Sequence, residues 1–387
     1  MHGIVHNRAS HRRIARCRDD HRGGPRRPRF DPRFAPIYGA VNRFSGYFGE
    51  TLSMVSIREV ARRAGVSVGT VSRVMNRNPT VQQATRERVE AAIRELDYVP
   101  NAIAASLRNR RTHTLGLIVP DVTNPYFAEL VRHIERAAAA SGYSLLLGNS
   151  DNAPSQERLY IRTLSTRRVD GLIIAPTDAS TLNSEATRVP IVLIDRPVAG
   201  HAVVASDHRE GAREATKYLA QLGHRRIACI AGPADIAVAR DRHAGWRDVA
   251  DDLLASVGID PASYARFGPF DFLSGEEMAR SLLTLDPRPT AIVTGSDQQA
   301  VGAMRAAADM QIPVPQALSI VGFDDIPLAM AVSPRLTTVS QPIRAISEEA
   351  VSALLRLRDG IALPARPPLR TRLEIRESCA PPANGSR

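Results

Sequence analysis

The sequence predicts two architectures in one chain, a small all-α region near the amino end and a larger α/β region after it. In residues 56–76, apolar side chains recur at helical spacing on both sides of a glycine. From Thr114 onward, short apolar runs alternate with amphipathic segments, which is typical of parallel sheets covered by helices. The length of 387 residues indicates two or three domains.

The stretch from Ser56 to Asn76, SIREVARRAGVSVGTVSRVMN, is typical of a DNA-reading helix-turn-helix. Ser56 and Glu59 have the spacing of a capping box, which predicts the start of the first helix. Gly65 offers the backbone freedom that a sharp turn needs, and Ser67 is placed to cap the second helix. A small helical hairpin with a solvated basic face is the alternative interpretation, but the order and spacing favour DNA binding.

The second helix of this stretch is where base contacts are expected. Arg73 is suited to guanine, while Val68 offers an apolar contact to a thymine methyl group beside Gly69. The polar side chains around them are expected to bind phosphates, which fixes the register without reading sequence. These side chains are Ser67, Thr70, Ser72 and Asn76.

A third helix is expected over Ala84–Leu96, followed by the stretch Tyr98–Thr112, YVPNAIAASLRNRRT. A short helix beginning at Asn101 is marginal in water by itself, so we expect it to form when it pairs with a second copy or docks on DNA. There Asn101, Ala104 and Leu107 are expected to contact DNA, with Leu107 as a wedge in the minor groove. The alternative is a plain basic linker with an incidental leucine.

Short apolar runs in the rest of the chain predict buried strands of parallel sheets. Amphipathic segments such as Tyr126–Ala140 and Gly211–Leu222 lie between them and predict the covering helices. The predicted strands are Leu115–Val119, Ser144–Leu147, Leu172–Ala175, Ile191–Ile194, Ile227–Ile230, Ala291–Thr294 and Ile320–Phe323.

The net charge of +11 is concentrated at the amino end. Residues 1–53 carry +7 and residues 54–112 carry +6, which leaves −2 for the remainder. A positive field at this end suits DNA phosphates, and a nearly neutral remainder suits a small-molecule sensor. Residues 1–53 are rich in Arg, His, Gly and Pro without periodicity, so we expect a disordered extension, with translation beginning at Met54.

Other classes of protein lack support in the sequence. No apolar run approaches the ~20 residues of a membrane span, and the three cysteines have no metal-ligand spacing. We therefore expect a cytoplasmic protein. The phosphate-binding pattern GxxxxGK and the zinc-protease pattern HExxH are absent, so we expect no enzyme activity, no cofactor and no metal site.

Several motifs follow one another along the chain in a characteristic order. They are AGVSVGTVSRVMN, YVPNAIAASL, DVTNPYF from Asp121, LGHRRIACIAGP from Leu222, RHAGW from Arg242, VGFDD from Val321 and LTTVSQP from Leu336. On these motifs the chain resembles the lac-repressor (LacI/GalR) family of bacterial transcription regulators over about Met54–Arg376. It departs from the family where Gln82 and Gln83 replace a common Ser cap, and where His208 replaces a common Asn.

The resemblance implies a two-lobed α/β sensor of the periplasmic sugar-binding type, with parallel doubly wound sheets, behind the DNA-binding head. The expected segments are a basic extension (1–53), a helix-turn-helix domain (54–100), a hinge helix with linker (101–113), an effector-binding domain (114–376) and a tail (377–387). One lobe is expected at about 114–205 and 342–368, and the other at about 207–340 and 370–376. Crossings between the lobes are expected near Ala205–Asp207 and Gln341.

In such a sensor the ligand binds in the cleft, beyond the carboxyl ends of the strands. Asp and Arg side chains offer directional, charge-assisted hydrogen bonds to hydroxyl groups, and aromatic rings cover the apolar faces of a sugar. The resemblance implies effector binding at Tyr126, Phe127, Asp195, Asp207, Arg242, Phe270, Asp297, Asp324 and Gln341.

Several of these residues also have structural interpretations. Asp195 and Asp324 can cap the helices that follow them. Arg242 can form an ion pair with a nearby Asp, and Tyr126 and Phe127 can be ordinary core residues.

The resemblance implies a ligand-responsive regulator that binds double-stranded DNA, a pseudopalindromic operator, as a homodimer. We expect a repressor of carbohydrate-utilisation genes, cytoplasmic and nucleoid-associated, that is released by a sugar or sugar-phosphate inducer. One alternative is a corepressor-dependent regulator with a purine-type ligand. Another is a solute-binding protein without a regulatory role, which would need a secretory signal and no DNA-binding head.

Overall fold

The computed structural model describes residues 55–75, 78–98, 111–177, 182 and 189–383. The chain forms two compact units, Met1–Pro100 and Asn101–Arg387. Within the described residues, no helix combines the length and the apolar character needed to cross a membrane.

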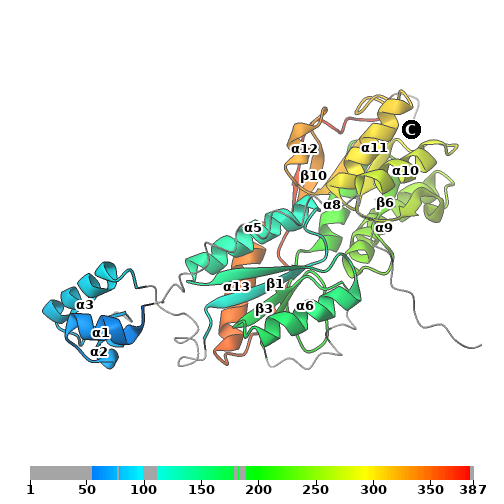
Figure 1. Ribbon diagram of the computed structural model, residues 1–387. Helices are drawn as coiled ribbons and strands as arrows, with labels where there is room; N and C mark the ends of the chain where they lie inside the picture. Colours follow the sequence, from blue (N-terminus) through cyan, green and yellow to red (C-terminus); the bar gives the residue numbers. More distant parts are fainter. Residues whose placement is uncertain (1–54, 76–77, 99–110, 178–181, 183–188, 384–387) are drawn as a thin grey trace, which may run out of the picture. The chain divides into compact units, whose positions relative to one another are not determined.

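The described part of the first unit consists of α1 (Ile57–Ala64), α2 (Val68–Met75) and α3 (Gln83–Glu95), coloured blue to cyan in Figure 1. The predicted capping box is confirmed. The backbone N–H of Ser56 donates to Glu59 Oε2 at 2.7 Å, and the backbone N–H of Glu59 donates to Ser56 Oγ at 3.4 Å. The sequence therefore places the start of α1 correctly.

The three helices of this head enclose a small core. Val60, Val71 and Val89, one from each helix, are completely buried. Gly65 ends α1 in the left-handed conformation, with φ 63°, which confirms the predicted turn. Helix α3 begins after Gln82, which provides no side-chain cap, as the departure from the family's usual Ser indicated.

The second unit contains two sheets, of which the first is fully parallel. Its strand order is β2-β1-β3-β4-β5, and helices α5 (Pro125–Ala140) and α13 (Ile343–Arg358) cover one face while α6 (Pro154–Thr166) covers the other (Figure 1). The order reverses between β1 and β3, so the loops after these strands diverge and open a crevice. The strands are β1 (Thr114–Val119), β2 (Ser144–Asn149), β3 (Gly171–Ile174), β4 (Ile191–Ile194) and β5 (Ala202–Val204).

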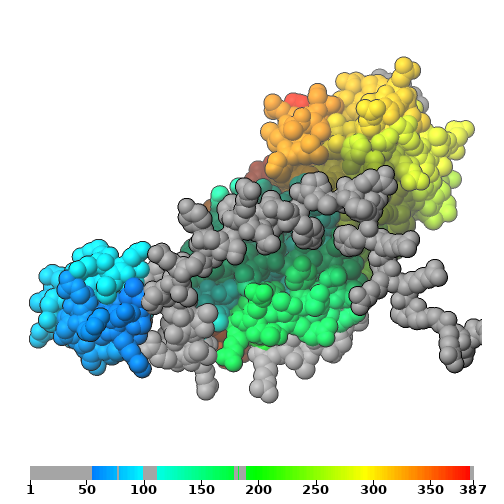
Figure 2. Space-filling view, in the orientation of Figure 1, coloured from blue at the N-terminus to red at the C-terminus, as the bar shows by residue number. Residues whose placement is uncertain are grey.

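The second sheet has the order β11-β10-β9-β8-β6-β7. Its strands are β6 (Ile227–Ala231), β7 (Ala265–Phe267), β8 (Ala291–Thr294), β9 (Ser319–Asp324), β10 (Thr337–Ser340) and β11 (Arg372–Glu374). Its helices are α8 (His208–Gln221), α9 (Ala237–Ser256), the 3-10 helix η3 (Pro261–Tyr264), α10 (Phe272–Leu283), α11 (Asp297–Asp309) and α12 (Leu328–Ala331). Helices α10, α11 and α12 form the yellow-to-orange surface in Figure 2.

Three details differ from the expected strands. β2 was expected to be buried, but Leu146 and Leu147 are 36% and 44% exposed because β2 lies at the edge of its sheet. The expectation of parallel sheets is wrong for β11, which pairs antiparallel with β10. The short strands β5, β7 and β10 lie outside the apolar runs that predicted strands.

The chain passes between the two sheets three times, after β5, after β10 and before β11. The first and third passages run side by side. The backbone N–H of Asp207 donates to the Leu369 carbonyl at 2.8 Å, and that of Leu369 donates to the Ala205 carbonyl at 2.7 Å. We call the two halves of this unit lobe 1, built on the first sheet, and lobe 2, built on the second.

Candidate DNA interface and effector cleft

Helix α2 presents the side chains that the sequence assigned to DNA. Val71 and Val74 are buried in the head, whereas Val68 is 37% exposed and Arg73 is exposed on the opposite side. Gly69 and Ser72 extend the same surface, Gly69 exposed and Ser72 half-buried. The helix therefore offers a short, mostly polar face with one free guanidinium group.

Ser67 shapes the start of α2. Its Oγ accepts a hydrogen bond from the backbone N–H of Thr70 at 3.1 Å, which is the predicted cap. Residues 65–69, GVSVG, also match the GxSxG pattern of serine hydrolases. That pattern acts at a strand-to-helix turn, whereas here the serine lies between two helices, so it carries no catalytic meaning.

The remaining DNA contacts expected from the sequence fall outside the described residues. They are Asn76, Asn101, Ala104 and Leu107.

The cleft between the lobes is built around Asp195, which ends β4 in a left-handed conformation with φ 60°. Its Oδ2 accepts from the Tyr126 hydroxyl at 2.7 Å, and its Oδ1 accepts from the Ser206 backbone N–H at 3.0 Å and lies 3.1 Å from His208 Nε2. Burial alone would raise the pKa of Asp195, but His208 and the hydrogen bonds from Tyr126 and Ser206 lower it to about 2. Asp195 is therefore a carboxylate at neutral pH.

Arg242 from α9 lies on the other side of His208. Its Nε donates to His208 Nδ1 at 3.3 Å, so Nδ1 needs a free lone pair and the imidazole proton sits on Nε2, where it donates to Asp195. The guanidinium also lies 3.2 Å from Asp324 Oδ1 and covers the Phe323 ring at 3.8 Å. Burial raises the pKa of Asp324, and the charge of Arg242 opposes that rise.

These contacts close into a ring that joins the lobes. The Gln341 amide donates to Asp324 Oδ1 at 2.7 Å, and its Oε1 accepts from the Ser206 hydroxyl at 2.8 Å. Ser206 in turn donates its backbone N–H to Asp195, as described above. The ring of polar contacts therefore runs through Asp195, His208, Arg242, Asp324, Gln341 and Ser206.

A cavity of about 50 Å³ opens beside this ring. Six of the nine predicted effector residues line it: Tyr126, Phe127, Asp195, Arg242, Phe270 and Asp324. The tip of the Phe270 ring lies against Gly232, where an added Cβ would come within 2.0 Å of Cζ. Part of the structural interpretation is correct, because Arg242 does pair with an Asp. Tyr126 is also buried, and Phe127 packs against the core of lobe 1. Neither Asp195 nor Asp324 caps a helix.

The other three predicted effector residues lie outside the lining. Gln341 stands behind Asp324 and contacts it directly. Asp207 caps α8, accepting from the backbone N–H of Glu210 at 3.0 Å. Asp297 is completely buried at the start of α11, where its Oδ2 accepts from the Ile326 N–H at 2.9 Å, and burial with nearby Asp324 raises its pKa.

The sequence did not indicate four polar residues of the site, which are Asn124, Arg196, Ser206 and His208. Arg196, directly after Asp195, lines the cavity and donates to the Thr177 carbonyl at 3.3 Å. Asn124 lines it as well and caps α5 through the Tyr126 N–H at 3.0 Å. Ser206 and His208 belong to the ring of polar contacts, and of these two only His208 stands out in the sequence, as a departure from the family. The available signal was proximity in the sequence, since Arg196 follows Asp195 and His208 follows Asp207.

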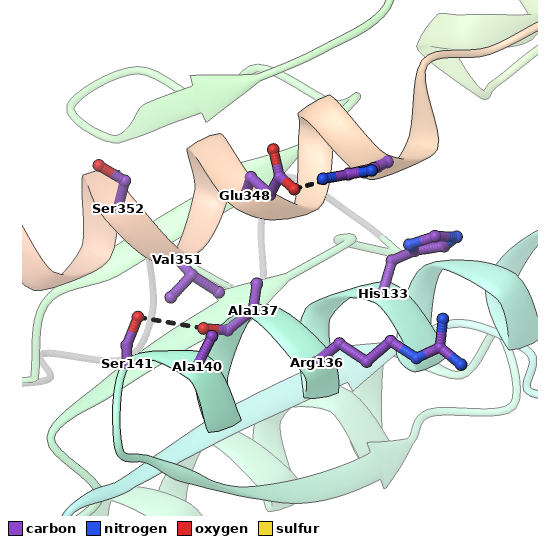
Figure 3. A pocket seen from close by; sticks show the side chains of 9 residues that line it. His133, Arg136, Ala137, Ala140, Ser141, Glu348, Val351 and Ser352 are labelled. Carbon is purple, nitrogen blue, oxygen red and sulfur yellow. Dashed lines mark hydrogen bonds and ion pairs between the residues drawn. The ribbon is translucent and has the colours of Figure 1, made fainter.

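A larger hollow of about 420 Å³ lies on lobe 1 between α5 and α13 (Figure 3). His133 and Arg136 border it from α5, and Glu348 borders it from α13, paired with Arg344 at 2.8 Å. None of the predicted effector residues lines it. The cleft, and not this hollow, gathers the side chains suited to a polyhydroxylated ligand.

Two family models match the chain. The model described as "Bacterial regulatory proteins, lacI family" matches residues 56–101, and the model described as "Periplasmic binding protein-like domain" matches residues 216–379. The first covers the head, and the second covers most of lobe 2 together with α13.

Curated relatives span the same region. The ribose operon repressor of Escherichia coli (strain K12) is 40% identical over 308 residues, covering 78% of this chain and 92% of that protein. The transcriptional repressor PurR of Klebsiella pneumoniae (strain 342) is 36% identical over 309 residues, covering 78% and 90%.

Solved structures agree in fold. The lac repressor dimer bound to operator and the anti-inducer ONPF matches with a TM-score of 0.74 and 31% identity, covering 84% of this chain and 99% of that chain. The complex of the transcriptional regulator CelR with cellobiose matches with a TM-score of 0.61 and 33% identity, over the same shares.

Proposed function

Because the chain belongs to the lac-repressor family of bacterial transcription regulators, we propose that its cleft binds a neutral monosaccharide that releases the operator. Members of this family are DNA-binding repressors and not enzymes. A relative at 40% identity is a ribose operon repressor, so D-ribose is the first candidate. The regulated genes are then those for carbohydrate use.

The charge balance of the cavity supports a neutral ligand over a sugar phosphate. The charged residues of its lining are two carboxylates, Asp195 and Asp324, and two guanidinium groups, Arg196 and Arg242. Arg242 is already paired with Asp324, and Arg196 follows Asp195 directly. A phosphate would bring about two more negative charges into a lining whose two carboxylates and two guanidinium groups already balance, and burying such charge is costly.

A purine corepressor is the alternative ligand. The aromatic rings of Phe127 and Phe270 can stack on a base as well as on a sugar. Val238, in the turn of α9 before Arg242, lines the cavity and offers no hydrogen bond to the polar edge of a base. This favours the sugar.

Ligand entry requires the lobes to move. A cavity of about 50 Å³ holds a few water molecules, which is less than a monosaccharide needs. Sugar hydroxyls then take over hydrogen bonds that Asp195 and Arg242 make within the ring of polar contacts, and the angle between the lobes changes. Because ligand and operator favour different angles, each weakens the other, typically by about 1–3 kcal/mol.

The DNA side of the proposal keeps the assignments made from the sequence. Two heads of a homodimer occupy successive major-groove half-sites, where Val68, Gly69 and Arg73 meet base edges. Ser67, Thr70, Ser72 and Asn76 hold phosphates, and the paired hinge helices insert Leu107 into the minor groove with Asn101 and Ala104 beside it. The protein acts in the cytoplasm, associated with the nucleoid.

The proposed segments are those expected from the sequence. They are the extension 1–53, the head 54–100, the hinge and linker 101–113, the effector domain 114–376 and the tail 377–387. Lobe 1 comprises about 114–205 and 342–368, and lobe 2 about 207–340 and 370–376.

Fluorescence anisotropy of the full chain on a labelled duplex from upstream of its own gene tests the proposal. A scrambled duplex, two salt concentrations and titrations with D-ribose, D-ribose 5-phosphate and a purine base complete the design. We expect the preference for the specific duplex to persist at the higher salt concentration. We expect D-ribose to release the operator, and D-ribose 5-phosphate and the purine base to leave it bound. Tightening by the purine would favour the corepressor, and release by the phosphorylated sugar would overturn the charge argument.

A further inference from the structure

The segment that leads into lobe 1 makes several hydrogen bonds to Asp170, a carboxylate outside the cleft. Asp170, just before β3, accepts at Oδ1 from the backbone N–H of Thr112 at 2.8 Å and from its hydroxyl at 3.0 Å. Its Oδ2 accepts from the backbone N–H of His113 at 3.0 Å. Its own N–H donates to the Thr114 carbonyl at 2.7 Å. One aspartate therefore fixes three consecutive residues.

The fastened segment has a backbone that needs support. His113 adopts a left-handed conformation with φ 49°, which is unfavourable for a residue with a Cβ. The Ser144 N–H donates to the His113 carbonyl at 2.9 Å, and the His113 ring lies 5.3 Å from that of Tyr143. Residues at the amino ends of β1, β2 and β3 thus converge here, at the end of the sheet opposite the cleft.

Helix α13 connects the two ends of lobe 1. It begins two residues after Gln341, a member of the ring of polar contacts, and its 16 residues span about 24 Å. Directly after it, Asp359 accepts from Arg111 at 3.0 Å, one residue before Thr112. A rigid element therefore joins the cleft to the same segment that Asp170 holds.

We propose that Asp170 is a positioning residue for the allosteric response, because it makes residues 111–114 part of the rigid body of lobe 1. Any rotation of lobe 1 at the cleft then changes the direction in which the chain leaves toward the DNA-binding head. Without the Asp170 carboxylate the segment would keep the Arg111–Asp359 pair and the backbone bonds at His113 and Thr114, and it would lose the side-chain bonds to Thr112 and His113. The segment would then be less rigid, and part of the movement would be lost before it reached the head. This inference rests on the proposed function for the identity of the effector, D-ribose. The expected effect of Asp170 on operator affinity does not depend on that identity.

The test compares the full chain with the variants Asp170→Asn and Asp260→Asn. The control Asp260 makes a similar side-chain bond in lobe 2, accepting from the Ala262 N–H at 3.1 Å. In Asp170→Asn an amide NH₂ can face a backbone N–H that needs an acceptor, at nearly unchanged volume. Operator affinity is measured with and without D-ribose, D-ribose affinity by calorimetry, and the melting temperature by circular dichroism.

We expect Asp170→Asn to bind D-ribose within about twofold of the wild type and the operator about tenfold more weakly, since lost charge-assisted bonds cost about that factor. Its operator affinity should respond to D-ribose far less than that of the wild type. Asp260→Asn should match the wild type in operator affinity, D-ribose affinity and melting temperature. An unchanged response in Asp170→Asn, or a parallel loss of D-ribose affinity, would overturn the inference.

The two proposals can fail separately. If D-ribose leaves the wild type on its operator, the proposed effector is wrong, while the operator affinities of the two variants still decide the role of Asp170. If the wild type responds to D-ribose and Asp170→Asn responds equally, the effector stands and the positioning role falls.

Discussion

His208 shows what single residues contribute that a sequence alone does not reveal. It stands between Asp195 and Arg242, which are 13 positions before and 34 positions after it. Each of those two residues was predicted to face the cleft, but the histidine that connects them was visible only as a departure from a common asparagine. Contacts between distant positions create the ring of polar contacts, and no local pattern encodes them.

Replacement of Arg242 by alanine should give a repressor that binds its operator but ignores D-ribose. The change removes the partner of His208 and leaves the buried Asp324 without its cation, so we expect about 3 kcal/mol lower unfolding free energy. Chemical denaturation and operator release by D-ribose measure the two effects. Arg247→Ala is the control that should change neither, because Arg247 is exposed on the same helix and pairs with the half-buried Asp251. Normal release by D-ribose in Arg242→Ala would refute the assignment.

Asp195 should make the stability of the protein depend on acid pH. Its pKa is lowered from 3.8 to about 2, so its stabilisation is fully present above the unfolded value and disappears as the pH falls through the folded value. The shift corresponds to about 2 kcal/mol. Urea unfolding of wild type and Asp195→Asn at several pH values should show a difference in free energy that narrows between pH 4 and pH 2. A gap that stays constant over that range would contradict the low pKa.

At the scale of elements, strands that form apolar runs could be predicted, whereas the edge position of β2 and the three-residue strands β5 and β7 could not. β3 and β4 are unbroken apolar runs because both faces of their sheet are covered. β2 has a similar run of leucines, yet it lies at an edge, and periodicity does not distinguish an edge from a centre. β5 and β7 have only three residues each, which is too short for any pattern to register.

The α2 helix leads to a prediction on base reading. Arg73→Ala should cost about 1–3 kcal/mol on the cognate operator and relax the preference for one base pair, because its exposed guanidinium is the best guanine reader on that face. Competition binding with single-base operator variants measures this. Arg63→Ala removes the same charge from α1, where Arg63 pairs with Glu95. It should weaken all duplexes alike, and equal loss on all duplexes for Arg73→Ala would exclude base reading.

At the scale of the whole molecule, the order of motifs predicted the family and the fold. Which of the predicted residues face the cleft could be seen only in the three-dimensional structure. Asp297 and Asp207 follow the same kind of pattern as Asp195, but Asp297 turns into the core of lobe 2 and Asp207 caps a helix. Whether an aspartate at a strand end faces ligand depends on the rotation of its backbone. Asp195 faces the cleft through its left-handed conformation, which no residue pattern specifies.

The predicted DNA contacts lie in the basic amino-terminal part of the chain, and the effector cleft lies in the nearly neutral remainder. Coupling between operator binding and effector binding therefore involves the entire chain. If D-ribose and operator favour different arrangements of the lobes, thermodynamic linkage requires each to lower the affinity for the other by the same factor. Calorimetric titration of D-ribose with and without saturating operator should therefore give the same ratio as operator titrations with and without D-ribose. If D-ribose releases the operator but saturating operator leaves the calorimetric affinity for D-ribose unchanged, the lobes do not couple the two sites. Release would then occur by competition from an unrecognised species.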